Sequence, residues 1–330
     1  MARCFVTGGS GFIGSHIVRL LDEAGHEVHV LIRKSSNLDL LAGTRALTVV
    51  GDITDGKGLL QAVPDDIEWF FHNAAIMADW GEARFKKVNV DGVQNVLEVV
   101  RQKDIPRLIY TSSTAVYGFP NRDEPISESY DHAPTNGYQR SKLAAEKLIH
   151  ESMTTQGIRA AMVRPPTVLG RGDMFTGPIL IERLRDGAMF CFGDGRNSQS
   201  FAHGEDVAQC LIKAAESFDV AYGSAYNVTS FTCEFIEFLD ALRKEIGTDK
   251  PVKKLPYQAA LTMGKIMGGL FKAFLRPNAP LITAFRVRLF GSKYIIDDTK
   301  ARMELGYEPK WNLESTVKDM VEWGGVFKPR

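Results

Sequence analysis

Short apolar runs alternate with helical patterns through the first half of the chain. The runs predict strands at residues 4–7, 27–32, 46–50, 69–73, 107–111 and 159–164. Between them, apolar residues recur at helical spacing at 14–23, 58–62, 85–101 and 138–156. Strands that alternate with helices over short connections form a parallel sheet with helices on both faces. We therefore expect an α/β fold with a doubly wound parallel sheet.

The second half has a less regular pattern. Helical spacing occurs at 177–186, 204–217, 232–246, 257–275 and 313–323, with Gly/Pro-rich segments between. We expect two units, 1–165 and a smaller, mostly helical C-terminal lobe at 166–330, with 204–227 returning to the first unit.

Composition narrows the class of protein. Of 330 residues, 44% are hydrophobic, and 40 Lys and Arg balance 40 Asp and Glu, so nothing in the net charge favours a nucleic-acid partner. The four cysteines form no metal-binding cluster, and we expect no metal. Without a leader pattern or an apolar run of about 18 residues, we expect a cytoplasmic protein with no transmembrane segment.

Glycines recur at positions 8, 11 and 14, directly after the first predicted strand. This spacing permits a tight turn and a close approach of backbone N–H groups to a diphosphate, at a helix N-terminus that favours anions. Phe12 and Ile13 open that helix. The pattern predicts that residues 1–165 form a Rossmann dinucleotide-binding domain, which leaves 166–330 as the substrate-binding lobe. The alternative is that the glycines form an ordinary turn that binds no cofactor.

Two cations, Arg33 and Lys34, end the second predicted strand, where an NAD site usually offers a carboxylate. Cations at this point suit the 2′-phosphate of NADP through charge-assisted hydrogen bonds. We therefore expect NADP, with NAD as the alternative if both side chains are merely solvated.

Tyr138 and Lys142 share one face of a predicted helix at i and i+4. A free tyrosine, with a pKa of about 10, exchanges protons poorly at neutral pH, and a neighbouring ammonium favours its phenolate. Upstream, the predicted strand 107–111 runs into a hydroxyl cluster that includes Ser113, at the sheet edge where α/β proteins place ligands. Together these residues predict that Tyr138 exchanges a proton with an alcohol or ketone oxygen, to which a serine of the hydroxyl cluster donates a hydrogen bond. A lone Tyr/Lys pair is more often an ordinary feature of a helix surface, which is the alternative.

Motifs in order along nearly the whole chain resemble an extended short-chain dehydrogenase/reductase of the NAD-dependent epimerase/dehydratase superfamily. They are TGGSGFIGSH, GDITD, HNAA, NVDGVQNVLE, YTSSTAVYG, YQRSK, RPPTVLGRGD, GDGRNSQSFAHGEDVA and DDTKARMELGY. The resemblance implies that Ser113 holds the substrate oxygen, that Tyr138 is the acid/base, and that Lys142 binds the nicotinamide ribose. It further implies cofactor contacts from Asp52, Ile53, Asn73, Ala74, Ala75, Asn89, Pro165 and Val168.

The branch of the family follows from two departures. Nucleotide-sugar members carry an arginine where this chain has Gln199, and dehydratases carry an acid pair where it has Ala115 and Val116. Arg196, Arg286 and Arg288 lie close enough in sequence to substitute for that arginine. The pattern most resembles the 3β-hydroxysteroid dehydrogenase-like and dihydroflavonol reductase-like branch, which implies an apolar substrate.

The segment 257–275 combines apolar residues at i, i+3 and i+4 spacing with lysines elsewhere on the helix. Its predicted stripe comprises Met263, Ile266, Met267, Leu270, Phe271 and Phe274. A lid over an apolar substrate, contact with a membrane surface, and plain packing all account for it.

We expect an NAD(P)-dependent oxidoreductase that interconverts a secondary alcohol and a ketone on a sterol-like or lipid-like substrate. The alternatives are a nucleotide-sugar 4-epimerase with tightly bound NAD and a non-catalytic dinucleotide sensor. The resemblance also implies a homodimer that pairs through 89–101 and 138–156, with apolar stripes at Val93, Val96, Leu97 and Val100 and at Leu143, Ala144, Lys147 and Leu148.

Overall fold

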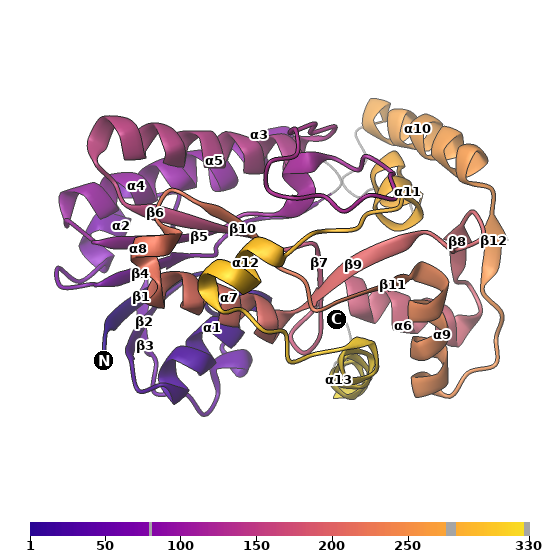
Figure 1. Cartoon of the computed structure of the whole chain (residues 1–330), viewed down its shortest axis with the longest axis horizontal. Helices are drawn as coiled ribbons and strands as arrows, with labels where there is room; N and C mark the ends of the chain where they lie inside the picture. The colour runs from indigo at the N-terminus through magenta and orange to yellow at the C-terminus, as the bar shows by residue number, and fades with distance from the viewer. Residues whose placement is uncertain (79–80, 275–281, 327–330) are drawn as a thin grey trace.

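The computed structural model describes residues 1–78, 81–274 and 282–326, and its centre is a seven-stranded sheet in the order β10-β6-β5-β4-β1-β2-β3 (Figure 1). All six pairings in this sheet are parallel. The strands are β1 (Arg3–Thr7), β2 (Glu27–Ile32), β3 (Leu47–Val50), β4 (Trp69–His72), β5 (Arg107–Thr111), β6 (Ala160–Arg164) and β10 (Ala225–Asn227). The predicted doubly wound Rossmann sheet is confirmed.

Helices cover both faces of this sheet, as its uninterrupted apolar strands require. Every residue of β4 and β6 is buried. One face packs against α1 (Phe12–Glu23) and α7 (Gly204–Glu216). The other packs against α2 (Gly56–Ala62), α4 (Gly92–Gln102) and α5 (Gly137–Gln156). The carboxyl ends of the strands thus converge on one edge, where α/β sheets bind ligands.

The helix expected at 85–101 is interrupted. It consists of α3 (Glu82–Phe85), a π-helical segment η2 (Lys86–Asp91) and α4. Segments of π-helix are rare and occur mostly at functional sites, because the wider turn re-aims a side chain. Here the segment carries Asn89, which is buried.

The C-terminal lobe contains more strand than the sequence pattern predicts. A three-stranded sheet orders β11 (Phe231–Glu234), β9 (Ser198–His203) and β7 (Thr167–Leu169), and β12 (Lys253–Leu255) pairs with β8 (Phe190–Phe192). The expectation of a helix over 232–246 is wrong for its first three residues, because Thr232, Cys233 and Glu234 pair with β9. The helices are α6 (Thr176–Asp186), α9 (Phe235–Ile246), α10 (Tyr257–Ala273), α11 (Ala284–Gly291) and α13 (Leu313–Val326).

Segments from the second half complete the first. Strand β10 pairs with β6 at the sheet edge, and α7 packs on α1. Short helices α8 (Phe218–Ala221) and α12 (Thr299–Leu305) cover the same region. Ala301, Leu305 and Tyr307 lie in the core cluster that also contains Val6. Within the described residues, no helix is long and apolar enough to cross a membrane.

Candidate active site

The turn between β1 and α1 leaves no room for side chains. Gly8 has φ +70°, and a Cβ there would lie 2.8 Å from the Cα of Ala74. A Cβ on Gly14 would overlap the carbonyl oxygen of Gly8. That oxygen also accepts a hydrogen bond from the N–H of Gly11 at 3.0 Å. The glycines therefore permit this backbone path, and other residues would not.

Helix α1 begins at this turn without a side chain that caps its N-terminus. Gly11 is its N-cap and offers no side-chain acceptor, and no acidic residue lies in the first turn. The first N–H groups of a helix have no partner within the helix, so those at Phe12 and Ile13 remain suited to an anion. The cradle fits the diphosphate of a dinucleotide.

The ends of β2 and β3 lie beside this cradle. Arg33 and Lys34 are exposed, and the N–H of Arg33 donates to Ser36 Oγ at 3.0 Å within a tight turn. Asp52 accepts from the N–H and Oγ1 of Thr54, at 2.8 and 2.9 Å, and Ile53 is buried. Both regions follow the carboxyl ends of adjacent parallel strands, so the residues predicted to contact the ribose and the adenine lie at the same edge of the sheet.

The turn after β4 touches the glycine turn directly. Asn73 and Ala74 donate from their backbone N–H groups to the carbonyl and Oγ1 of Thr7, each at 3.3 Å. Ala75, the next residue, is exposed. The three predicted residues therefore lie on the cofactor side of the sheet, where their conformation depends on β1.

Asn89 acts on this turn through hydrogen bonds within the protein. Its Oδ1 accepts from the N–H of Ile76 at 2.9 Å, and its Nδ2 donates to the carbonyl of Ile76 and to Ser141 Oγ, both at 3.0 Å. These bonds tie the π-helical segment to the 73–78 turn and to α5. Asn89 therefore positions the turn, and its amide group is already hydrogen-bonded within the protein.

Ser113 and Tyr138 are brought together from β5 and α5. Ser113 caps the short helix η3 (Thr114–Tyr117), accepting from the N–H of Ala115 at 3.1 Å. Asn136 caps α5 by accepting from the N–H of Gln139 at 2.9 Å, which places Tyr138 in the first turn. The hydroxyl of Ser113 lies near enough to that of Tyr138 to lower the pKa of the tyrosine.

Lys142 lies one helical turn after Tyr138 and is buried. Its Nζ donates to the carbonyl of Thr111 at 2.8 Å and lies 4.9 Å from the ring centroid of Tyr110. Burial lowers the pKa of Lys142 to about 8, and the charge of Glu146 acts in the opposite direction. Its ammonium is thus held at the carboxyl end of β5.

The pKa of Tyr138 departs from our expectation. We expected the ammonium of Lys142 to draw it down; instead, burial raises the pKa of Tyr138 above its ordinary value, and the nearby hydroxyl of Ser113 offsets part of that rise. The reason is geometric, because Lys142 is directed to the Thr111 carbonyl. The resting tyrosine is therefore a neutral phenol, which is a proton donor.

A buried ion pair beneath these residues was not among the predicted site residues. Glu146 receives two hydrogen bonds from the Arg164 guanidinium, at 2.8 and 2.7 Å, and one from Ser112 Oγ. Arg164 also donates to the hydroxyl of Tyr117 at 2.7 Å. The signals were present: Glu146 repeats the i+4 spacing of Lys142, and Arg164 is a cation at the end of an apolar strand.

Pro165 and Val168 follow this strand. The carbonyl of Pro165 accepts from the N–H of Thr114 at 3.0 Å and from Ser113 Oγ at 3.4 Å. Val168 is half-buried on β7 and packs against the core of the sheet domain. The segment after β6 therefore lies against Ser113, the predicted catalytic serine.

A family model described as "NAD dependent epimerase/dehydratase family" matches residues 4–229, which hold every site residue named above. The chain belongs to this family. The predicted resemblance is confirmed, and the protein is an NAD-dependent oxidoreductase of the extended short-chain dehydrogenase/reductase type.

Similar proteins cover almost the whole chain. A 3-beta-hydroxysteroid dehydrogenase of Mycolicibacterium neoaurum is 30% identical over 98% of this chain and 91% of its own length. The crystal structure of gox2253 superposes with a TM-score of 0.83 at 26% identity, covering 99% and 98% of the two chains. A UDP-glucose 4-epimerase of Thermotoga maritima, at 24% identity, 98% and 99% coverage and a TM-score of 0.79, shares the fold.

Gln199 separates this member of the family from those that bind a diphosphate with arginine. The side chain is buried on β9, and its Nε2 donates to the carbonyls of Leu289 and Ser292 at 2.8 and 3.1 Å. It therefore holds the end of α11 against β9. A group committed to two backbone carbonyls provides no cation for a diphosphate.

Aromatic rings adjoin the hydroxyl cluster. The Tyr294 hydroxyl donates to the carbonyl of Thr114 at 2.5 Å, next to Ser113. Its ring lies 5.5 Å from that of Phe119, which lies 5.8 Å from Phe285 on α11. These aromatic rings pack together beside the hydroxyl cluster, and Tyr294 is itself buried.

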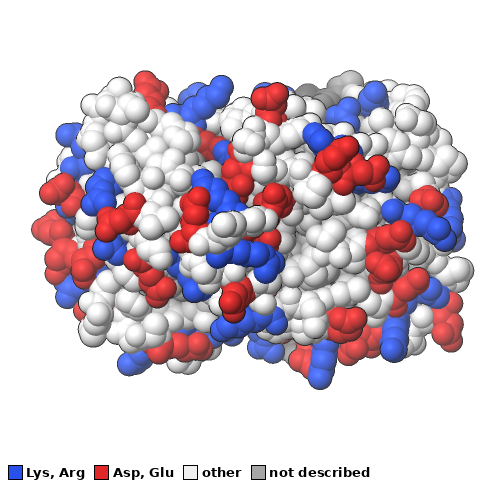
Figure 2. Space-filling model, viewed as in Figure 1, with Lys and Arg blue, Asp and Glu red and all other residues white. Residues whose placement is uncertain are grey.

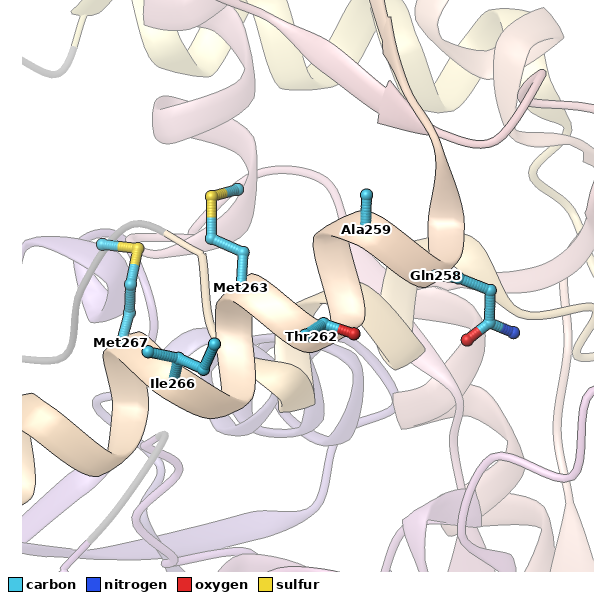
Figure 3. Close-up of a pocket in the computed structure, with 6 residues that line it drawn as sticks. All are labelled: Gln258, Ala259, Thr262, Met263, Ile266 and Met267. Atoms are coloured by element: carbon cyan, nitrogen blue, oxygen red, sulfur yellow. The ribbon is translucent and has the colours of Figure 1, made fainter.

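The predicted apolar stripe of α10 is half-buried at some residues and exposed at others. Met263, Met267 and Phe271 are half-buried, whereas Ile266, Leu270 and Phe274 are exposed. The two methionines point to the same side of the helix and line a shallow hollow with Ile266 (Figure 3). Packing therefore accounts for half of the stripe; Leu275, Pro277 and Pro280 lie outside the described residues.

Proposed function

We propose that this oxidoreductase interconverts a secondary alcohol and a ketone on a sterol-like or similarly apolar substrate, with NADP as its preferred cofactor. The observation that carries the proposal is the meeting of Ser113, at the end of β5, with Tyr138 in the first turn of α5, and the buried ammonium of Lys142 one turn further along that helix.

The chemistry follows from the states of these three residues. When bound, the dinucleotide supplies or accepts the hydride. Tyr138, held as a neutral phenol, donates its proton to the carbonyl oxygen, and Ser113 donates a hydrogen bond that fixes this oxygen. Lys142 places a positive charge near the phenolate that remains, which stabilises it. In alcohol oxidation, Tyr138 must first lose its proton to solvent, and the phenolate then takes the proton of the substrate hydroxyl.

Three features support the substrate class. The similar 3-beta-hydroxysteroid dehydrogenase acts, by its name, on a steroid alcohol. The half-buried rings of Phe119 and Phe285, which pack together near the hydroxyl cluster, suit an apolar ring system. Gln199 is committed to backbone carbonyls, which disfavours a nucleotide-sugar diphosphate.

The same proposal includes a cytoplasmic homodimer. The free thiols of Cys4, Cys191, Cys210 and Cys233 support a reducing compartment.

Replacement of Tyr138 tests the function. We expect Tyr138→Phe to lower kcat by about 10²–10⁴-fold, the usual contribution of a positioned proton donor, while the affinity for dinucleotide stays close to normal. NAD(P)H absorbance with a panel of steroid ketones and alcohols measures turnover, and fluorescence titration measures cofactor affinity.

Tyr222→Phe is the matched control, because this tyrosine is exposed and distant in sequence from the site. Wild-type turnover by Tyr138→Phe would exclude the proposed proton donor. Turnover of UDP-sugars with NAD retained through purification, and none of steroid ketones, would replace the dehydrogenase by an epimerase.

A further inference from the structure

The charges of the chain are segregated along the sequence. Residues 250–296 contain nine Lys or Arg and no Asp or Glu, although the whole chain carries 40 of each kind. The cations are Lys250, Lys253, Lys254, Lys265, Lys272, Arg276, Arg286, Arg288 and Lys293. A neutral protein therefore has one strongly basic segment, and α10 and α11 lie within it.

Helix α10 packs against α11 with one face only. Ala260 is fully buried, and a Cβ on Gly264 would lie 2.7 Å from the backbone nitrogen of Ala284. This close contact fixes the orientation of α10 on the lobe. The side of the helix away from α11 is thereby left open.

The open side of α10 carries large apolar side chains. Ile266, Leu270 and Phe274 follow one another at i+4 spacing and are 59%, 51% and 74% exposed. Lys265 is exposed on the same helix, and Lys253 and Lys254 are exposed on the strand that leads into it. In Figure 2, the surface at the position of α10 is mostly uncharged. An exposed apolar row on a helix whose lysines lie on its other faces and at its start is the pattern of a helix that lies in a membrane interface.

We propose that α10 binds an anionic lipid surface, with Ile266, Leu270 and Phe274 entering the acyl region and the surrounding lysines meeting lipid phosphates. Cations near an anionic bilayer add to the free energy gained from apolar insertion. The helix lies flat on such a surface, since among the described residues none crosses the membrane.

Charge complementarity favours an anionic lipid surface over a second copy of the chain as the partner of α10. A two-fold interface brings the same patch of both copies together. Here it would set cations against cations, because residues 250–296 contain no carboxylate. Lys293 already pairs with Asp123 of the same chain. An anionic surface meets the apolar row and the lysines without that repulsion.

The hollow on α10 next to this apolar row could receive a lipid-soluble ligand from the bilayer. Met263, Met267 and Ile266 line it, so it adjoins the face that would enter the bilayer (Figure 3). Methionine adapts to irregular apolar ligands. This placement accords with the proposed substrate class, but lipid binding does not rest on it.

Vesicle sedimentation tests the proposal with the full chain. We expect the protein to sediment with vesicles of phosphatidylcholine containing about one third phosphatidylglycerol, and to bind pure phosphatidylcholine much more weakly. High salt should release it, because screening shortens the reach of the charges. Lys265→Gln should weaken binding about fivefold, the change expected for one cation near the surface.

The double variant Ile266→Ser/Leu270→Ser should lose vesicle binding, whereas Val220→Ser should retain it. Val220 is a matched control, since it is 54% exposed on α8 in the sheet domain. Both variants change exposed side chains, and circular dichroism would verify their fold. Turnover of a water-soluble ketone without vesicles reports separately on the proposed function.

Two results would overturn the proposal. The first is equal sedimentation with anionic and neutral vesicles, or none with either. The second is a double variant that still binds vesicles while its mass in solution falls from dimer to monomer, which would assign this face to contact between copies.

Discussion

Arg33 is exposed at the end of β2, in a turn closed by its own N–H and the hydroxyl of Ser36. The backbone is therefore fixed, while the guanidinium is directed to solvent on the cofactor side of the sheet. Arg33→Asp should lower the affinity for NADP by about ten- to a hundredfold, because a hydrogen bond between charged groups contributes about 1.5–3 kcal/mol. It should also raise the affinity for NAD, since a carboxylate accepts from the ribose 2′-hydroxyl.

Fluorescence titration of both dinucleotides against wild type and variant measures this change. Lys318→Asp, which reverses an exposed charge on α13, is the control and should leave both affinities unchanged. A wild type that already prefers NAD by about tenfold contradicts the role given to Arg33.

The proximity of the proposed catalytic side chains could be predicted from sequence because their spacing is local. Tyr138 and Lys142 occupy one helix, and Ser113 follows one strand. Glu146 and Arg164 could not be paired in this way, because α5 and β6 bring them together only in the folded chain. The pKa of Tyr138 was beyond sequence reasoning for the same reason, since it depends on burial.

Between elements, the Glu146–Arg164 pair joins α5 to β6 directly under Lys142. Glu146→Gln should lower the stability of the protein by about 3–5 kcal/mol, because it leaves a buried guanidinium without its anion. It should also lower the pKa of Lys142 below its value of about 8, since the anion that raises it is lost. A base with a lower pKa loses its charge at lower pH, so the alkaline limit of kcat/KM should move to lower pH.

Chemical denaturation and a pH profile of kcat/KM separate these two effects. Glu151→Gln, on the exposed side of the same helix, is the control. The double variant Glu146→Gln/Arg164→Met removes both charges and should recover stability, while the altered pH limit persists. An unchanged pH limit in both variants would reduce the pair to a structural role.

The elements that the sequence did not predict depend on distant partners. Strand β12 contains two lysines and becomes a strand only through its pairing with β8, about sixty residues earlier. The first three residues expected in a helix at 232–246 instead pair with β9. Alternation and helical spacing identified the central sheet because its strands are apolar and long enough to show a pattern.

For the whole molecule, the surface left for a partner is more polar than expected. Val93, Val96, Leu97 and Val100 are all buried within their own chain. The groove between α4 and α5 is lined mostly by polar residues, including Gln94, Glu98 and Glu151. A homodimer through these helices would therefore have a hydrated interface, as many specific interfaces do.

Light scattering at micromolar concentration should still give twice the 36.6 kDa of one chain. Because the interface is polar, we expect the dimer to dissociate on dilution more readily than an obligate one. Dilution series in low and high salt check this, and a mass of one chain throughout would refute the homodimer.

The late segments in the sheet domain have a consequence for synthesis on the ribosome. Strand β10 forms the edge of the central sheet, and Ala301, Leu305 and Tyr307 close the core around β1. The dinucleotide-binding half therefore lacks part of its interior until residues 299–307 have been synthesised. During that interval its apolar surface is open to chaperones and to neighbouring nascent chains. The first half of the chain thus completes its fold only after most of the C-terminal lobe has been made.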